Sequence, residues 1–287
     1  MKTYPGDDAL RLKGRLLGRK WLLLRRLSQL LVMTAFWSGP WWGVWIAKGN
    51  LSSSLLLDTV PMTDVLTFLQ VLASGIRPEA QAVWGFAGAV GVYALLGGRT
   101  FCAWACPVNP VTDAAAWLRG RLGIGRVLSL PRWSRYVVLA VALALAALTG
   151  SQAWELINPM SAVHRGLIFG MGLGWWMVLA LFLFDLLLAK EGWCGRLCPN
   201  GAAYSLLSPV ALVRVEAHRR EACDDCMDCF LVCPEPQVIA PALKSGPEGS
   251  PMIRGWQCTH CGRCIDVCSK DVYRFSWTLA NGSKVAS

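Results

Sequence analysis

The stretch that decides the fold lies near the C-terminus, where two segments carry identically spaced cysteines. They read Cys223-Asp-Asp-Cys226-Met-Asp-Cys229-Phe-Leu-Val-Cys233 and Cys258-Thr-His-Cys261-Gly-Arg-Cys264-Ile-Asp-Val-Cys268. Both follow the pattern C-x2-C-x2-C-x3-C, which is typical of chains that wrap cubane iron–sulfur clusters. Eight of the twelve cysteines lie here, so the sequence predicts two [4Fe–4S] clusters in this region.

In bacterial two-cluster ferredoxins, the fourth cysteine of each run binds the cluster of the other run. This rule predicts that the first cluster takes Cys223, Cys226, Cys229 and Cys268, and that the second takes Cys258, Cys261, Cys264 and Cys233. Zinc or disulfides are the alternatives, but zinc sites usually show two separated C-x2-C pairs. We therefore expect a small α+β two-cluster ferredoxin-type domain over residues 216–277, followed by a tail at 278–287.

The rest of the chain is unusually apolar. Over the whole chain only 16% of the residues are charged, against about a quarter in a soluble domain of ordinary composition. Four apolar runs, at 27–46, 82–97, 136–153 and 168–189, approach the roughly 20 residues that cross a bilayer. The sequence thus predicts an all-α membrane bundle, with four transmembrane helices in two hairpin repeats, over residues 27–215. A basic N-terminal segment, 1–26, precedes it.

The positive charges predict the orientation of such a bundle. Eight basic residues precede the first run and six lie in the loop 98–135, whereas the loops on the other side hold three. By the positive-inside rule, both termini would be cytoplasmic in a multi-pass protein of the bacterial inner membrane. A reducing compartment suits thiolate ligands. The net charge of +10 flanks apolar runs and forms no basic stripe, so nucleic acid is not an expected partner.

A second cysteine motif occurs twice in the apolar part. Phe-Cys102-x3-Cys106-Pro and Trp-Cys194-x3-Cys198-Pro lie 92 residues apart, each after an apolar run. Recurrence at equivalent points indicates an internal repeat. If the repeats pack together, their thiols could hold a third iron–sulfur cluster, which is the preferred interpretation, or act as redox dithiols. Two pairs of buried cysteines without a ligand are the structural alternative.

The electron donor is predicted by elimination. None of the three histidines lies within an apolar run and no C-x-x-C-H occurs, which excludes b-type haem in a bilayer and c-type haem. No G-x-G-x-x-G run follows a strand, which disfavours a Rossmann-bound nicotinamide or flavin. A quinol that feeds one-electron clusters remains, and so the chain would be a quinol-oxidising component.

A quinol site needs a proton acceptor and hydrogen-bonding groups. His164 can accept a proton at physiological pH, although a histidine satisfied by water is an equally good interpretation. An ionisable group inside an apolar run is often functional, and Asp185 is such a group. The candidate residues are His164, Arg165, Glu155 and Asp185, with Asn158 and Asp58 as further candidates on the outer side of the predicted bundle.

The combination of four apolar runs, two C-x3-C-P motifs and a C-terminal two-cluster ferredoxin resembles the NapH family. The stretches Asn158-Pro-Met-Ser-Ala-Val-His164-Arg and Cys264-Ile-Asp-Val-Cys-Ser-Lys-Asp-Val also resemble it. The resemblance covers nearly the whole chain. The second quartet ends in Cys268-Ser269 where Cys-Pro is usual, but proline supplies no ligand.

The resemblance implies the membrane component of a quinol dehydrogenase in the periplasmic nitrate reductase system. Its expected partners are a periplasmic polyferredoxin of the NapG type and a membrane-anchored cytochrome c or the nitrate reductase. Two other functions fit the same plan. One is an accessory factor that delivers electrons for assembly of a metalloenzyme, and the other is a structural anchor, which would leave twelve cysteines without a role.

Overall fold

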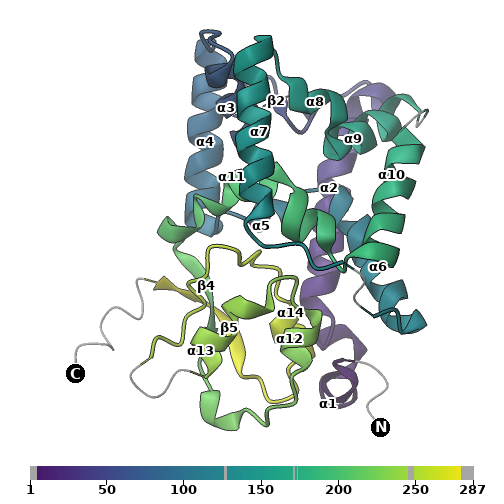
Figure 1. The fold of residues 1–287 in the computed structure, drawn as a ribbon, viewed down its shortest axis with the longest axis vertical. Coiled ribbons are helices and arrows are strands. Elements are labelled where there is room, and N and C mark those ends of the chain that lie inside the picture. The colour runs from purple at the N-terminus through teal and green to yellow at the C-terminus, as the bar shows by residue number, and fades with distance from the viewer. Residues whose placement is uncertain (1–4, 126–127, 171, 173, 245–248, 279–287) are drawn as a thin grey trace. The chain divides into compact units, whose positions relative to one another are not determined.

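The computed structural model describes residues 5–125, 128–170, 172, 174–244 and 249–278. The chain forms two compact units, and each is built from separate pieces of sequence. The ferredoxin-type unit comprises Met1–Ser28, Tyr93–Trp104 and Ser205–Ser287, and the helical unit comprises Gln29–Val92 and Ala105–Tyr204. Figure 1 shows the elements of both units, and each unit is described by itself below.

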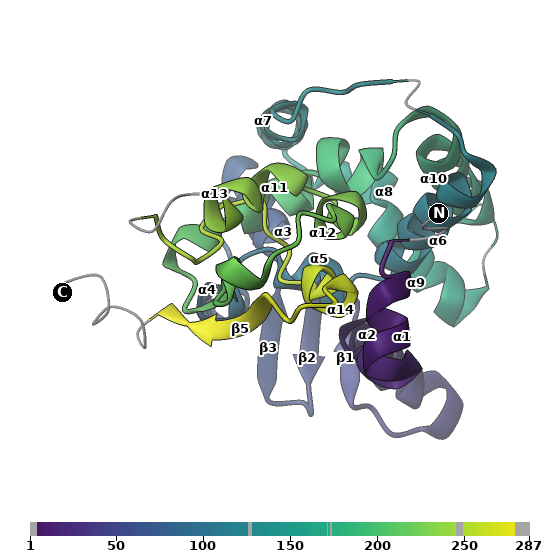
Figure 2. The same cartoon turned by 90° about the horizontal axis from the view of Figure 1, so that it is seen from below.

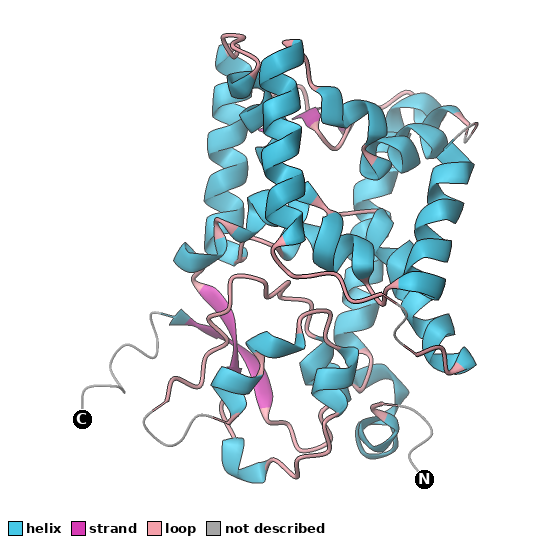
Figure 3. Ribbon diagram, viewed as in Figure 1, coloured by secondary structure: helices cyan, strands magenta, loops and turns pink. Residues whose placement is uncertain are grey.

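The ferredoxin-type unit is built on two antiparallel strands, β4 (Val213–Ala217) and β5 (Tyr273–Trp277), in which Val215 pairs with Phe275. Three short helices accompany them: α12 (Asp228–Val232), α13 (Ala240–Leu243) and α14 (Arg263–Val267) (Figure 3). Val215, Ile239, Ile253 and Val272 form the centre of its core, each about 1% exposed, and the cysteines pack against them. Of the expected tail at 278–287, only Thr278 is among the described residues, and its N–H donates to Leu212.

The N-terminal segment packs on this unit. Helix α1 (Asp7–Leu17) contacts α14 (Figure 2), and α2 (Lys20–Trp42) follows it. The Gly6 N–H donates to the Asp228 carboxylate, and the N–H groups of Trp21 and Leu22 both donate to the Asp266 carboxylate. The first turn of a helix has N–H groups without partners inside the helix, so Asp266 satisfies two of them from another element.

The helical unit begins with the rest of α2 and a three-stranded antiparallel sheet, β1 (Ala47–Gly49), β2 (Ser53–Leu56) and β3 (Val60–Thr63). Its helices are α3 (Val65–Ala73), α4 (Ala80–Leu96), α6 (Val108–Leu122), α7 (Ser134–Thr149), α8 (Ala153–Ile157), α9 (Pro159–Phe169), α10 (Gly174–Leu183) and α11 (Pro199–Ser205). Two π-helical turns, η1 (Phe184–Leu188) and η2 (Trp193–Leu197), follow α10. Helix α5 (Thr100–Trp104) belongs to the ferredoxin-type unit.

The prediction of a four-span membrane bundle is wrong, and so is the multi-pass inner-membrane location derived from it. Within the described residues, no helix combines the length and the apolar character needed to cross a membrane. Helices α4 and α7 have 17 and 16 residues, short of the roughly 20 required. The fourth run is divided, because α9 ends at Phe169 and a new helix starts at Gly174.

Helix α2 is long enough, with 23 residues, but its first part is polar. Its side chains Arg25 and Gln29 are buried, at 1% and 4% exposure. Arg25, which the sequence analysis counted among the charges flanking a bilayer, is therefore an interior residue. Charge counting failed here because it treats every arginine as solvent-facing.

Candidate iron–sulfur centres

Four cysteines line a hollow in the ferredoxin-type unit. They are Cys223, Cys226, Cys229 and Cys268, and the surrounding wall includes Leu243, Val272 and Tyr273. The hollow contains about 370 Å³ of space between atoms, counting the part open to solvent. Hydrogen bonds reach its sulfurs: the Tyr273 hydroxyl lies 3.5 Å from Cys229 Sγ, and the Val272 N–H donates to Cys268 Sγ at 3.4 Å.

A second hollow of about 370 Å³ is lined by the other four cysteines, Cys233, Cys258, Cys261 and Cys264. Its wall includes Val215, Ile239 and Ile253. The structure thus brings together the members of each predicted ligand set. Cys233 lies with the second run, and Cys268 lies with the first run.

The two loops reach this arrangement through the same backbone geometry. In each loop the second cysteine is flanked by left-handed residues: Asp225 and Met227, with φ of 54° and 65°, surround Cys226, and His260 and Gly262, with φ of 50° and 71°, surround Cys261. Left-handed conformations turn the chain sharply and are rare for residues other than glycine. Their repetition at equivalent places indicates that both loops are shaped to wrap the same kind of group.

The donor set fits a cluster. Burial raises the pKa of the Cys258 thiol to about 12 and raises the pKa of Cys264 as well. A buried thiolate needs neighbouring positive charge, which bound iron would supply by deprotonating the thiols that coordinate it. Among the described residues, no three His, Cys, Asp or Glu side chains lie close enough together to hold one metal ion. The thiols surround a volume, as a cube of iron and sulfur requires.

The segment Tyr93–Trp104 contacts the loop of the second hollow, and the sequence analysis missed this contact. Arg99, 1% exposed, pairs with the Glu235 carboxylate at 3.0 Å and donates to the Gln257 carbonyl at 2.9 Å. The Trp104 indole N–H donates to the His260 carbonyl at 3.0 Å. A Cβ on Gly97 would lie 2.5 Å from the His260 ring, so only glycine fits there. The sole sequence signal is the closeness of Arg99 to the first C-x3-C-P motif.

Three of the four C-x3-C-P cysteines lie in the helical unit, namely Cys106, Cys194 and Cys198, whereas Cys102 lies on α5 in the ferredoxin-type unit. Burial raises the pKa of Cys194, and the charges of Cys198, Cys106 and Asp185 raise it further. The Thr112 hydroxyl lies 3.7 Å from Cys194 Sγ. Cys106, Cys198 and Asp185 are therefore each within electrostatic reach of Cys194.

His164, the predicted proton acceptor, lies on α9 and is 2% exposed. Its ring packs edge-on against Phe36, with centroids 4.6 Å apart, and neither ring nitrogen has a hydrogen-bond partner among the described residues. Burial, together with the smaller effect of the charge of the exposed Arg165, lowers the pKa of His164 to about 4. The imidazole is therefore neutral at physiological pH.

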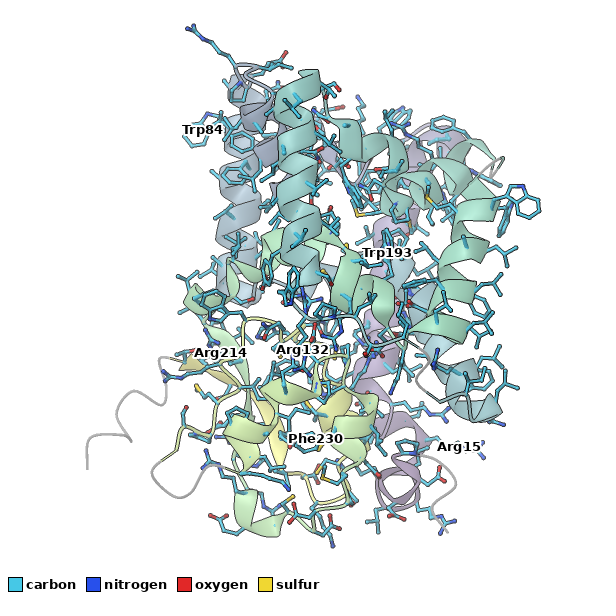
Figure 4. All side chains as sticks on the ribbon, viewed as in Figure 1. Arg15, Trp84, Arg132, Trp193, Arg214 and Phe230 are labelled. Carbon is cyan, nitrogen blue, oxygen red and sulfur yellow. The ribbon has the colours of Figure 1, made fainter. Side chains whose placement is uncertain are left out.

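The other quinol candidates lie apart from His164 in the hydrogen-bond network. Glu155 accepts from the hydroxyls of Ser52 and Ser161 and from the Asn158 amide. Asp185 accepts from the Trp193 N–H at 3.0 Å, and Trp193 is labelled in Figure 4. Burial raises the pKa of Asp185 to about 7. Among the described residues, no hydrogen bond or ion pair joins His164, Glu155 and Asp185 to one another.

Asp64 is a buried carboxylate that the sequence analysis did not consider as a site residue. It accepts from the Tyr204 hydroxyl at 2.8 Å and the Asn200 amide at 3.3 Å, and it caps α3 through the Leu66 and Thr67 N–H groups. Burial raises its pKa to about 6, and the charge of Glu155 adds to this effect. The available signal was an aspartate directly before an apolar run, which is typical of a helix N-cap.

Comparison with known proteins assigns the chain to a protein family. A family model described as a 4Fe-4S dicluster domain matches residues 222–272, and one described as a 4Fe-4S binding domain matches 82–125 and 168–214, the two stretches with the C-x3-C-P motifs. The ferredoxin-type protein NapH of Escherichia coli is 50% identical over 99% of this chain and 98% of its own length. The chain belongs to the NapH family. It is an iron–sulfur electron-transfer protein.

The NapH family has relatives in another system. The methylamine utilization ferredoxin-type protein MauN of Methylorubrum extorquens is 47% identical over 92% of this chain and 91% of its own length. The regulatory protein NosR of Pseudomonas aeruginosa is 27% identical over 88% of this chain, which covers only 34% of NosR. No solved structure matches this chain.

Proposed function

We propose that this protein oxidises a quinol and passes the electrons toward a periplasmic nitrate reductase, with a polyferredoxin of the NapG type as its partner. The observation that supports electron transfer best is the pair of hollows, each lined by four cysteines in the exchanged pattern of two-cluster ferredoxins. Quinol oxidation releases two electrons and two protons, and each bound cluster supplies a one-electron step.

We assign [4Fe–4S] clusters to the two hollows and a third iron–sulfur cluster to the C-x3-C-P motifs. The third assignment is supported by the electrostatic influence of Cys106 and Cys198 on Cys194. It is supported as well by the 4Fe-4S family model, which matches both stretches that contain these motifs. The soft thiolates suit iron.

His164 is the proton acceptor in this proposal. A neutral imidazole whose nitrogens lack partners can accept a hydrogen bond from a quinol hydroxyl and then its proton. The Phe36 ring beside it provides the apolar contact that a quinone ring prefers. Asp64, with its pKa near 6, can receive a proton at a later stage within the same unit.

The nitrate system is preferred because NapH of Escherichia coli matches over nearly its full length. MauN is almost as similar, at 47% identity against 50% for NapH. The choice of the nitrate system for the terminal acceptor therefore rests on a difference of three percentage points in identity. The oxidation of quinol does not depend on that choice.

The test is anaerobic reduction of the purified, cluster-loaded protein by a water-soluble menaquinol analogue, followed by EPR. We expect reduced-cluster signals to appear with quinol. General-base catalysis contributes about a hundredfold or more. We therefore expect His164→Asn to slow the appearance of the reduced-cluster signals by at least about tenfold. His218→Asn, in the ferredoxin-type unit, is the matched control and should leave the rate unchanged. Clusters that dithionite reduces but quinol does not would refute the proposal and favour an accessory factor with another donor.

A further inference from the structure

The two cysteine-lined hollows differ in the charges around them. The charged residues that line the first are three carboxylates and one lysine: Asp224, Asp225, Asp228 and Lys270. Those that line the second are one carboxylate and one arginine: Glu235 and Arg263. Lys244 pairs with Asp225 at 3.4 Å, and with it counted the first hollow still has an excess of one carboxylate, whereas the wall of the second carries no excess of either sign.

Two further arginines act on the second hollow from outside its wall. Arg99 donates at 2.9 Å to the carbonyl of Gln257, the residue before Cys258, and Arg214 directly precedes Val215, which lines the hollow. Arg99 pairs with Glu235 at 3.0 Å, so Glu235, Arg263 and Arg99 together leave one positive charge at the second hollow. Arg214 adds a second positive charge, and the exposed Arg254 lies near it.

Arg214 is a buried cation held by carbonyl groups. It is 5% exposed on β4 (labelled in Figure 4), next to Val215, which lines the second hollow. Its guanidinium donates to the carbonyls of Ser208, Pro209 and Ala211 at 2.9, 2.8 and 3.1 Å. No carboxylate in the described part of the chain pairs with it. A buried charge is costly without a counter-charge, and Cys258 is the member of the second set that acts on Arg214 electrostatically.

We propose that the two clusters are inequivalent, that the second is the more readily reduced, and that Arg214 is the positioning residue that makes it so. This inference rests on the proposed presence of two [4Fe–4S] clusters. One-electron reduction adds a negative charge, which positive neighbours stabilise and carboxylates disfavour, and cluster potentials respond to such charge. An added electron then resides on the second cluster, beside the segment that carries Arg99, Trp104 and Cys102.

The test is a dithionite titration of the anaerobic, cluster-loaded protein, monitored by EPR at poised potentials, with iron and sulfide counted in each variant. Wild type should show two separate midpoints in the ferredoxin-type unit. Arg214→Gln should lower the upper midpoint, with about a tenfold fall in the equilibrium constant for reduction, or ~59 mV for one electron. Arg214→Lys, which keeps the charge, should restore the wild-type value.

Asp228→Asn removes a carboxylate from the first hollow and should raise the lower midpoint alone. Arg274→Gln is the matched control, since Arg274 lies on the paired strand, is 55% exposed and has Glu216 as its partner; neither midpoint should move. The inference fails if Arg214→Gln, with its full iron content, shifts only the lower midpoint or shifts neither midpoint. It also fails if Asp228→Asn raises the upper midpoint. Should Arg214→Gln lose its clusters, Asp228→Asn still decides. Fewer than two clusters in wild type would instead refute the proposed function.

Discussion

At the scale of single residues, Asp64 predicts a dependence of stability on pH. Its pKa is about 6 in the folded protein, against 3.8 for an ordinary aspartate, because the carboxylate is buried. Between these pH values the folded state binds more protons than the unfolded state. The contribution of Asp64 to the free energy of unfolding therefore falls as the pH rises from about 4 to about 6. Asp64→Asn removes this loss. The free energy of unfolding of the variant, relative to that of wild type, should therefore rise by about 2–3 kcal/mol between pH 4 and pH 7.

Anaerobic urea unfolding at several pH values measures that gain. Asp58→Asn is the control, because Asp58 is exposed and paired with Lys48 in the same hairpin region, and it should not reproduce the gain of about 2–3 kcal/mol expected for Asp64→Asn. His164 acts in the opposite direction, since its pKa of about 4 costs stability as the pH falls from 6.5. A constant difference for Asp64→Asn would mean that the carboxylate is not buried as described.

Single residues also show how much of the candidate site could be predicted from the sequence. The grouping of Cys233 with the second run and Cys268 with the first follows from spacing alone, because ligand geometry dictates the spacing. Asp64, Arg99 and Arg214 could not be found in this way. Their importance depends on burial by segments distant in sequence, such as Tyr204 for Asp64 and Glu235 for Arg99.

At the scale of elements, the attachment of α2 to the ferredoxin-type unit predicts a local change in stability. The Asp266 carboxylate accepts from the Trp21 and Leu22 N–H groups at 3.1 and 2.9 Å. Asp266→Ala leaves both donors without this partner, at a cost of about 1–3 kcal/mol. We expect faster hydrogen exchange at Trp21 and Leu22, measured by mass spectrometry of N-terminal peptides. Asp271→Asn, which alters only the exposed pairing with Lys13, should leave that exchange unchanged; equal acceleration in both variants would contradict a specific role for Asp266.

The observed helices also explain why the four apolar runs were wrongly predicted to span a membrane. Each of the four runs does contain helix, since apolar character and the lack of internal breakers favour it. Helix length was misjudged because hydropathy does not register where a helix is interrupted. Gly170, with φ of 99°, ends α9 near the start of the fourth run, and the π-helical turn η1 follows α10 near its end. The hairpin strands β1 to β3 are too short to leave a clear alternating pattern.

At the scale of the whole molecule, the remaining question is how many clusters the chain holds. Three [4Fe–4S] clusters require about twelve iron atoms per chain, and two require about eight. Cys194→Ser should lower the iron and sulfide content by about four atoms each and leave both midpoints of the ferredoxin-type unit in place. That unit draws all eight of its predicted ligands from the segment 223–268.

Cys102→Ser extends the same measurement, because Cys102 belongs to the ferredoxin-type unit whereas Cys194 belongs to the helical unit. Loss of the same four irons in both variants would mean that one centre takes ligands from both C-x3-C-P motifs. Cys258→Ser is the comparison, since it should disturb a midpoint of the ferredoxin-type unit and spare the third centre. Full iron in both Cys102→Ser and Cys194→Ser would exclude a third cluster. The C-x3-C-P cysteines would then be redox dithiols or packed thiols, and electrons would enter the two-cluster unit by another route.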